Sequence, residues 1–178
     1  MEKNNYAEGG FVSEETLEKC IIKKEEGYFL PKNVKIAQSI VGTSKGRPEN
    51  DFYPTPPEET KGLLNNYKFL KNIIWECACG NGAISEVLIE KGFEVISTDK
   101  FDHGYSYPCY DFLNLDFRFA DTIITNPPFK LAEKFIQHAF DLKVTDMALL
   151  LKLSFLEGQK RKQLFSELPQ KEILVFSK

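Results

Sequence analysis

The chain has 178 residues and a net charge of −3, with 42% hydrophobic and 28% charged residues. These proportions are typical of a soluble globular domain and exclude a collagen-like or disordered chain. The longest unbroken apolar stretch, 147–151, is far shorter than the roughly 20 residues that cross a bilayer. Four cysteines do not make a disulfide framework in a chain of this length, so we expect a cytoplasmic protein with no membrane partner.

Charge is distributed unevenly along the chain. Residues 32–48 contain four Lys or Arg and no Asp or Glu, whereas residues 49–142 contain fifteen acidic and eight basic residues. Residues 143–178 are again basic, with seven basic and four acidic residues. An acidic middle between two basic stretches predicts a charged ligand or a polyanionic partner.

The composition divides the chain into an N-terminal region, 1–50, and a core, 51–178. Acidic residues in a first turn, followed by apolar residues at helical spacing, predict a helix over 13–26. Glycine and proline predict a mobile basic loop over 41–50.

From residue 51 onward, short apolar runs alternate with helical patterns. The spacing predicts helices over 55–67, 83–91, 131–142 and 157–168, and strands over 72–76, 94–98, 122–125, 146–151 and 173–176. This alternation predicts an α/β fold with a mostly parallel sheet and helices on both faces. In such sheets the ligand lies at the carboxyl ends of the strands.

Two segments at predicted strand ends are candidates for a ligand site. Residues 76–82, E-C-A-C-G-N-G, follow a strand and open a helix, and their glycines allow a ligand to approach the backbone closely. A purely structural strand-to-helix turn is the alternative. Asp99 ends the next strand, where a carboxylate can accept hydrogen bonds from two ribose hydroxyls, or can serve as a turn residue or helix cap.

Asn126-Pro127-Pro128-Phe129 follows the strand at 122–125. The two prolines remove two backbone donors and fix the direction of the chain. They leave the Asn126 amide and the Pro127 carbonyl as acceptors beside the flat ring of Phe129. A planar base with an exocyclic amino group fits these groups, and stacking on the ring would contribute roughly 1–3 kcal/mol. The alternative is a rigid loop without a ligand.

Five sequence elements stand in one order in the core: Y-P-T-P-P-E at 53–58, E-C-A-C-G-N-G at 76–82, Asp99, D-F-L at 111–113 and N-P-P-F at 126–129. Together they resemble the motifs of S-adenosylmethionine-dependent adenine-N(6) DNA methyltransferases, particularly the small phage- and plasmid-type enzymes. The resemblance covers roughly 51–177. It implies a Rossmann-like methyltransferase fold and transfer of a methyl group to adenine in DNA.

The resemblance also implies the residues of the cofactor site. Phe52, Tyr53 and Thr55 would lie beside the methionine moiety, and Glu76, Cys77 and Gly80 would line its amino-acid and sulfonium region. Asp99 would hold the ribose, and Asp111 and Phe112 would hold the adenine. Acidic groups near a cationic sulfonium are stabilising, which would explain part of the acidic middle of the chain.

Asn126, Pro127 and Phe129 would be the catalytic residues that hold the target adenine, and Asn126 would also border the cofactor. The reaction would be a direct displacement that relies on positioning and electrostatics. A base inside a duplex cannot reach such a pocket, so it would have to flip out. The candidate phosphate contacts are Lys45, Arg47, Lys130, Lys160 and Arg161. We expect no metal, because Cys77 and Cys79 belong to no four-ligand set.

Two features depart from the family pattern. The short interval between the glycine segment and N-P-P-F has no room for a target-recognition domain, and we expect none after it. The final strand of such folds is also expected to be missing, which would leave a sheet edge open to a partner subunit or a second copy. Three interpretations therefore stay open: an adenine-specific DNA methyltransferase, the same chemistry on RNA adenine or protein glutamine, or a truncated cofactor- or DNA-binding module without turnover.

Overall fold

The computed structural model describes residues 53–106, 109–157 and 159–176. The helix predicted at 13–26 and the loop predicted at 41–50 lie outside these residues. So do three candidate site residues, Lys45, Arg47 and Phe52.

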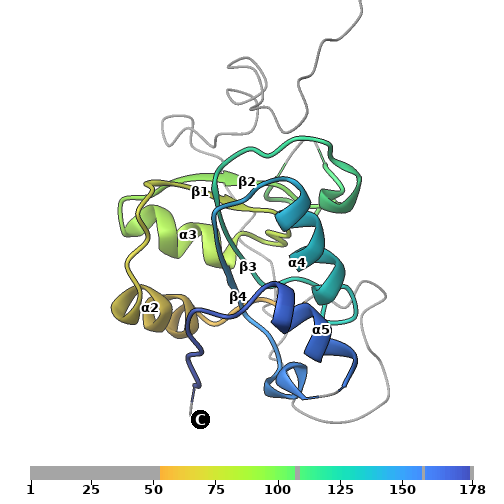
Figure 1. Ribbon diagram of the computed structural model, residues 1–178. Coiled ribbons are helices and arrows are strands. Elements are labelled where there is room, and N and C mark those ends of the chain that lie inside the picture. Colours follow the sequence, from red (N-terminus) through yellow and green to blue (C-terminus); the bar gives the residue numbers. More distant parts are fainter. Residues whose placement is uncertain (1–52, 107–108, 158, 177–178) are drawn as a thin grey trace, which may run out of the picture.

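The centre of the fold is a sheet of four parallel strands (Figure 1). The strands are β1 (Ile73–Glu76), β2 (Glu94–Ser97), β3 (Thr122–Thr125) and β4 (Asp146–Leu149). Their order is β2-β1-β3-β4, and Ile74 of β1 pairs with Val95 on one side and Thr122 on the other. The parallel sheet predicted from the alternating pattern is therefore confirmed.

Helices cover both faces of this sheet. The α-helices are α2 (Pro57–Asn66), α3 (Ala83–Glu90), α4 (Ala132–Asp141) and α5 (Lys160–Glu167), and two short 3-10 helices are η1 (Phe112–Asn114) and η2 (Leu153–Leu156). Every helix and strand predicted from residue 55 onward is present except the last, with ends shifted by at most three residues. The result is an α/β architecture compatible with a Rossmann-like fold.

Alternate residues of the strands face two different cores. Ile74, Val95 and Ile124 point toward α2 and α3, and pack with Ile84 and Leu88. Their neighbours Trp75, Ile96 and Ile123 point to the opposite face, where α4 and the segment around η1 cover them. Figure 1 shows α3 and α4 on opposite sides of the sheet. A third cluster, built on Ala132, Phe155 and Leu164, joins α5 and η2 to the outer side of α4.

The topology determines where a ligand can bind. β1 is the first strand in the chain but lies inside the sheet, with β2 on one side and β3 on the other. Crossovers from β1 and from β3 therefore run in opposite directions, and a crevice opens at the carboxyl ends of these strands. The glycine segment follows β1, Asp99 follows β2 and N-P-P-F follows β3, so all three meet at this edge.

The strand predicted over 173–176 is wrong. This segment is irregular, with Ile173 52% and Val175 68% exposed. Side chains hold the end of the chain beside α2 instead: the Phe176 ring lies against Gly62, and the Lys171 ammonium lies 2.9 Å from the Tyr67 hydroxyl. Figure 1 shows this dark blue segment running beside α2. A β-branched apolar run forms a strand only where a neighbouring backbone pairs with it, and β4 is an edge of the described sheet.

None of the described helices combines the length and the apolar character that crossing a membrane requires.

Candidate functional site

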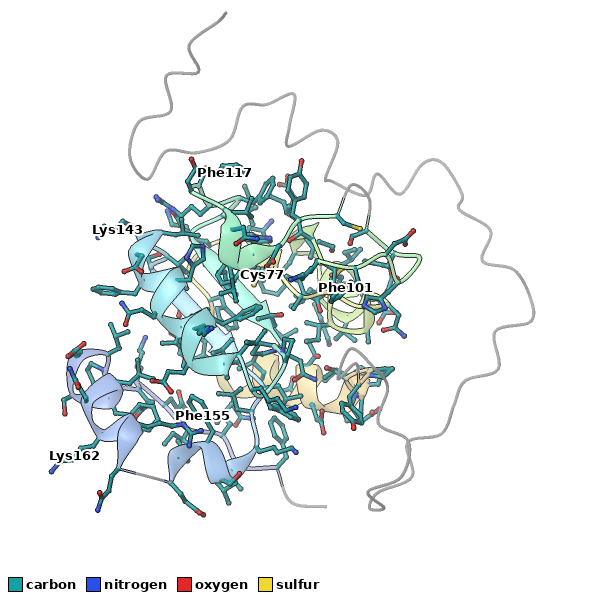
Figure 2. The ribbon with its side chains drawn as sticks, turned by 90° about the vertical axis from the view of Figure 1, so that its right-hand side faces the viewer. Cys77, Phe101, Phe117, Lys143, Phe155 and Lys162 are labelled. Atoms are coloured by element: carbon teal, nitrogen blue, oxygen red, sulfur yellow. The ribbon has the colours of Figure 1, made fainter. Side chains whose placement is uncertain are left out.

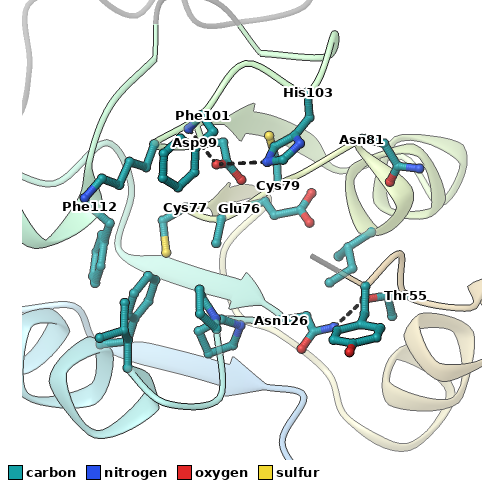
Figure 3. A pocket seen from close by; sticks show the side chains of 18 of the residues that line it. Thr55, Glu76, Cys77, Cys79, Asn81, Asp99, Phe101, His103, Phe112 and Asn126 are labelled. Carbon is teal, nitrogen blue, oxygen red and sulfur yellow. Dashed lines mark hydrogen bonds and ion pairs between the residues drawn. The ribbon is translucent and has the colours of Figure 1, made fainter. Parts of the chain in front are cut away.

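A pocket of about 430 Å³ lies at the carboxyl ends of β1, β2 and β3 (Figure 3). The residues predicted from sequence that line it are Tyr53, Thr55, Glu76, Cys77, Asp99, Asp111, Phe112, Asn126, Pro127, Phe129 and Lys130. Gly80 is absent from the lining, but its backbone N–H is bonded to Asp99. Apart from Gly80, and from Phe52 outside the described residues, the structure thus gathers around one pocket the residues that the sequence analysis assigned to the cofactor and to the target base.

The glycine segment turns from β1 into α3 at Gly82, which has φ +80°. The Tyr105 ring lies where a Cβ at Gly82 would be, and the Tyr105 hydroxyl donates to Glu86 at 2.7 Å. The structural explanation therefore accounts for Gly82: the residue must adopt a left-handed conformation and admit an aromatic ring. The loop 100–106 is held across the glycine segment by this contact.

Asp99 joins the glycine segment to the loop after β2. Its Oδ2 accepts from the Gly80 N–H at 2.8 Å, its Oδ1 accepts from the Phe101 N–H at 2.9 Å, and His103 Nε2 lies 3.7 Å from Oδ1. A carboxylate offers about four lone-pair sites, so two backbone donors leave acceptor capacity for ligand hydroxyls. Asp99 therefore shapes the pocket wall and can bind a ligand at the same time.

Glu76 is a carboxyl group at the floor of the pocket, with 1% of its surface exposed. The Ser85 hydroxyl donates to it, and Ser85 in turn lies 2.6 Å from the Ser97 hydroxyl. Burial raises the pKa of Glu76 to about 8, and the nearby Asp99 charge acts in the same direction, whereas the Ser85 hydrogen bonds lower it. Glu76 is therefore largely protonated at neutral pH, and a cation placed beside it would favour the ionised form.

The two cysteines of the glycine segment are buried. Burial raises the pKa of Cys77 well above its ordinary value and that of Cys79 to about 12, so both remain thiols at neutral pH. Within the described ranges, no group of three or more His, Cys, Asp and Glu side chains is arranged to hold a metal ion.

Asn126 is oriented by a contact with the segment before α2. Its Nδ2 donates to the Thr55 Oγ at 3.0 Å, and a dashed line marks this bond in Figure 3. Because the amide nitrogen is used in this way, the amide oxygen is the atom left to accept from a ligand. The sequence analysis placed Thr55 beside the cofactor, and the structure gives it the additional role of positioning Asn126.

Asp111 and Phe112 have structural contacts of their own. The Asp111 carboxylate accepts from the Leu113 N–H at 3.2 Å and lies 2.9 Å from the Lys100 ammonium. Phe112 lines the pocket but is only 1% exposed, and its ring packs on Trp75. Most of the Phe112 ring therefore belongs to the core, and little of its face is open to a ligand.

Four polar or aromatic residues of the pocket received no individual role from the sequence: Asn81, Lys100, Phe101 and His103. Each one directly follows or lies near a recognised element, Asn81 within the glycine segment and the others just after Asp99. Hydrophobic periodicity carries no information about such loops, because loop side chains are positioned by tertiary contacts. Phe101 is 42% exposed, whereas Phe112 is 1% exposed.

The basic candidates fall in different places. Lys130 lines the main pocket, and Arg161 lines a smaller hollow beside Phe129. Lys160 begins α5. Lys130 and Arg161 are thus near N-P-P-F.

No protein-family model, no curated protein and no solved structure matched the chain. By its fold, the chain is an α/β protein with a four-stranded parallel sheet flanked by helices. Its function has to be inferred from the chemistry of the pocket at the carboxyl ends of the central strands.

Proposed function

We propose that the protein transfers the methyl group of S-adenosylmethionine to the exocyclic amino group of adenine in DNA. The observation that carries the proposal is a single pocket that contains two buried acidic groups, Glu76 and Asp99, together with Asn126 and Phe129. Its volume of about 430 Å³ lies within the range of roughly 300–1,000 Å³ for small-ligand sites.

The acidic half of the pocket has the chemistry that the cofactor requires. Glu76 would accept from the ammonium of the methionine moiety and lose its proton as it does so, because an adjacent cation favours the carboxylate. Asp99 has acceptor capacity left for the ribose hydroxyls. When bound, the cofactor would supply an electrophilic methyl group on a sulfonium centre.

The other half of the pocket has the chemistry that the target base requires. The Asn126 amide oxygen and the Pro127 carbonyl would accept the two N–H groups of the adenine amino group, and the Phe129 ring would stack on the base. Two acceptors favour a more tetrahedral nitrogen, whose lone pair is then available. Thr55 would act as a positioning residue, since it holds the Asn126 amide in orientation.

The electron and proton balance needs no metal and no oxidant. The nitrogen lone pair forms the new N–C bond, the S–C bond breaks with its electron pair remaining on sulfur, and one amino proton passes to solvent. Positioning of the two reacting atoms, together with acceptors aimed at the charge that develops on nitrogen, is what the chain would contribute to the rate.

The decisive experiment supplies the protein with cofactor labelled in the methyl group and with separate pools of DNA, RNA and protein. We expect label on adenine in the DNA pool. Label only on RNA adenine or on protein glutamine would replace the substrate while keeping the chemistry. Cofactor binding without label in any pool would contradict the proposal and leave a binding module without turnover.

A further inference from the structure

A second, smaller hollow adjoins the main pocket. It has a volume of about 70 Å³ and is lined by Phe129, Leu151, Lys152, Ser154, Phe155 and Arg161. These residues come from N-P-P-F, from the chain after β4 and from η2 and α5. Phe129 lines both hollows, so the ring proposed to hold the target base also borders this second space.

Lys152 contributes a positive charge to this hollow. Its Nζ lies 4.8 Å from the centre of the Phe129 ring. Among the described residues it has no carboxylate partner, and no acidic side chain lines the hollow. An ammonium over an aromatic face is weakly stabilised there and keeps its charge available for an anion.

Arg161 contributes a buried donor that lacks an acceptor. Its guanidinium lies 4.3 Å from the centre of the Phe155 ring, and one terminal nitrogen donates to the Glu157 carbonyl at 2.9 Å. Its Nε is buried and has no hydrogen-bond partner among the residues that the structure describes. A buried donor without an acceptor is unfavourable, and Arg161 adds a second positive charge to the lining of the hollow.

We propose that this hollow binds a backbone phosphate of the nucleic-acid strand whose adenine enters the main pocket. The proposal rests on the function proposed above. Arg, Lys and Ser are the side chains that most often contact phosphate oxygens, and such contacts fix the register of a strand without reading its sequence. A flipped-out nucleotide requires its backbone to be held beside the base pocket, and Phe129 joins the two sites.

The test measures binding of a single-stranded DNA oligonucleotide with one adenine by fluorescence anisotropy. It compares the wild-type protein with Lys152→Gln and with Lys162→Gln. Lys162 is the matched control, because it carries the same charge on α5 but is exposed and does not line the hollow. Figure 2 shows Lys162 at the outer surface and Phe155 inside the molecule.

We expect Lys152→Gln to weaken binding about tenfold and to reduce the slope of log affinity against log salt by about 0.7, as for one phosphate contact on a single strand. Lys162→Gln should change both quantities much less. A second series replaces one phosphodiester next to the adenine with a neutral methylphosphonate. The neutral linkage at the contacted position should weaken binding to the wild-type protein more than binding to Lys152→Gln, because the part of the contact made by Lys152 is already lost in the variant.

The phosphate site would be overturned if Lys152→Gln and Lys162→Gln weakened DNA binding equally. It would also be overturned if the effect of Lys152→Gln on binding added to that of the neutral linkage at every position tested. Methyl transfer to the same oligonucleotide separates this failure from failure of the proposed function. If the wild-type protein transfers the methyl group but Lys152→Gln is additive with every neutral linkage, that is, shows no coupling to any phosphate, only the phosphate site is refuted. Coupling at Lys152 without transfer would support the phosphate site and refute the enzymatic function.

Discussion

The two halves of the main pocket are built differently. In the acidic half, Glu76 and Asp99 are at most 8% exposed and already have partners in Ser85, Gly80 and Phe101. In the other half, Asn126 and Phe129 are only half-buried, and Asn126 is oriented by a single bond to Thr55. The acidic half is therefore preorganised, whereas the groups of the N-P-P-F half have fewer contacts within the protein.

This difference implies separate energetic roles. Changes in the acidic half should alter cofactor affinity and the pH dependence of the protein, while changes in the N-P-P-F half should alter transfer or the affinity for the nucleic acid. The predictions below test this separation, from the largest expected effect to the smallest.

Replacement of Asn126 should have the largest effect. Asn126→Ala would remove the acceptor that we propose for the amino group in the transition state, so transfer should fall about 100- to 1,000-fold while cofactor affinity is unchanged. Labelled methyl transfer and calorimetric titration with cofactor measure the two quantities. Asn72→Ala, on an exposed residue before β1, is the control. Loss of cofactor binding in Asn126→Ala would show that the two halves are assigned wrongly.

Replacement of Phe129 should affect the affinity for the target. Phe129→Leu removes base stacking of roughly 1–3 kcal/mol, so KM for DNA should rise about 5- to 150-fold. Phe129→Tyr keeps the ring and should stay close to the wild-type value. A KM that is insensitive to both substitutions would argue against stacking at this ring.

Glu76→Gln should weaken cofactor binding about tenfold, because a charge-assisted hydrogen bond to the ammonium is replaced by a neutral one. Wild-type affinity should rise with pH and level off above about 8, as Glu76 of the unliganded protein loses its proton, and the variant should lack this rise. Titrations in two buffers of different ionisation enthalpy would detect the proton released. An affinity that does not vary with pH in the wild-type protein would exclude this linkage.

Glu76 should also make the stability of the unliganded protein depend on pH. Because burial raises the pKa of Glu76 from 4.5 to about 8, the folded state binds this proton more tightly than the unfolded state does. Its contribution to the free energy of unfolding is therefore complete below about pH 4.5 and is lost as the pH rises to about 8. The stability of Glu76→Gln relative to wild type should increase over this window in urea titrations.

The smallest expected effect is on stability, and it distinguishes backbone strain from side-chain packing at Gly82. Gly82→Ala and Gly92→Ala both place a side chain at positive φ, but only Gly82 faces a neighbour, the Tyr105 ring. Backbone strain of about 1–3 kcal/mol should be shared by both variants, and Gly82→Ala should be further destabilised by the contact. Thermal unfolding measures both, and a Tyr105→Ala background should remove the difference between them.

The sequence by itself determined the alternating strands and helices, the parallel sheet and eleven of the residues that line the pocket. Those features follow from periodicity and from topology, because the carboxyl ends of parallel strands lie at one edge of the sheet. Local patterns indicate which residues can be buried, and they were sufficient to predict the strand segments 74–76, 95–97 and 122–125, which are buried in the structure.

Tertiary structure decided the features that depend on partners distant in the chain. The apolar segment 173–176 has strand character but pairs with no described strand. The Asn126–Thr55 bond joins residues 71 positions apart in the chain. The Lys152 ammonium contacts the Phe129 ring although α4 and β4 separate the two residues in the sequence. Neither pairing leaves a periodic signal, because loop side chains are brought together only when the strands that carry them pack into one sheet.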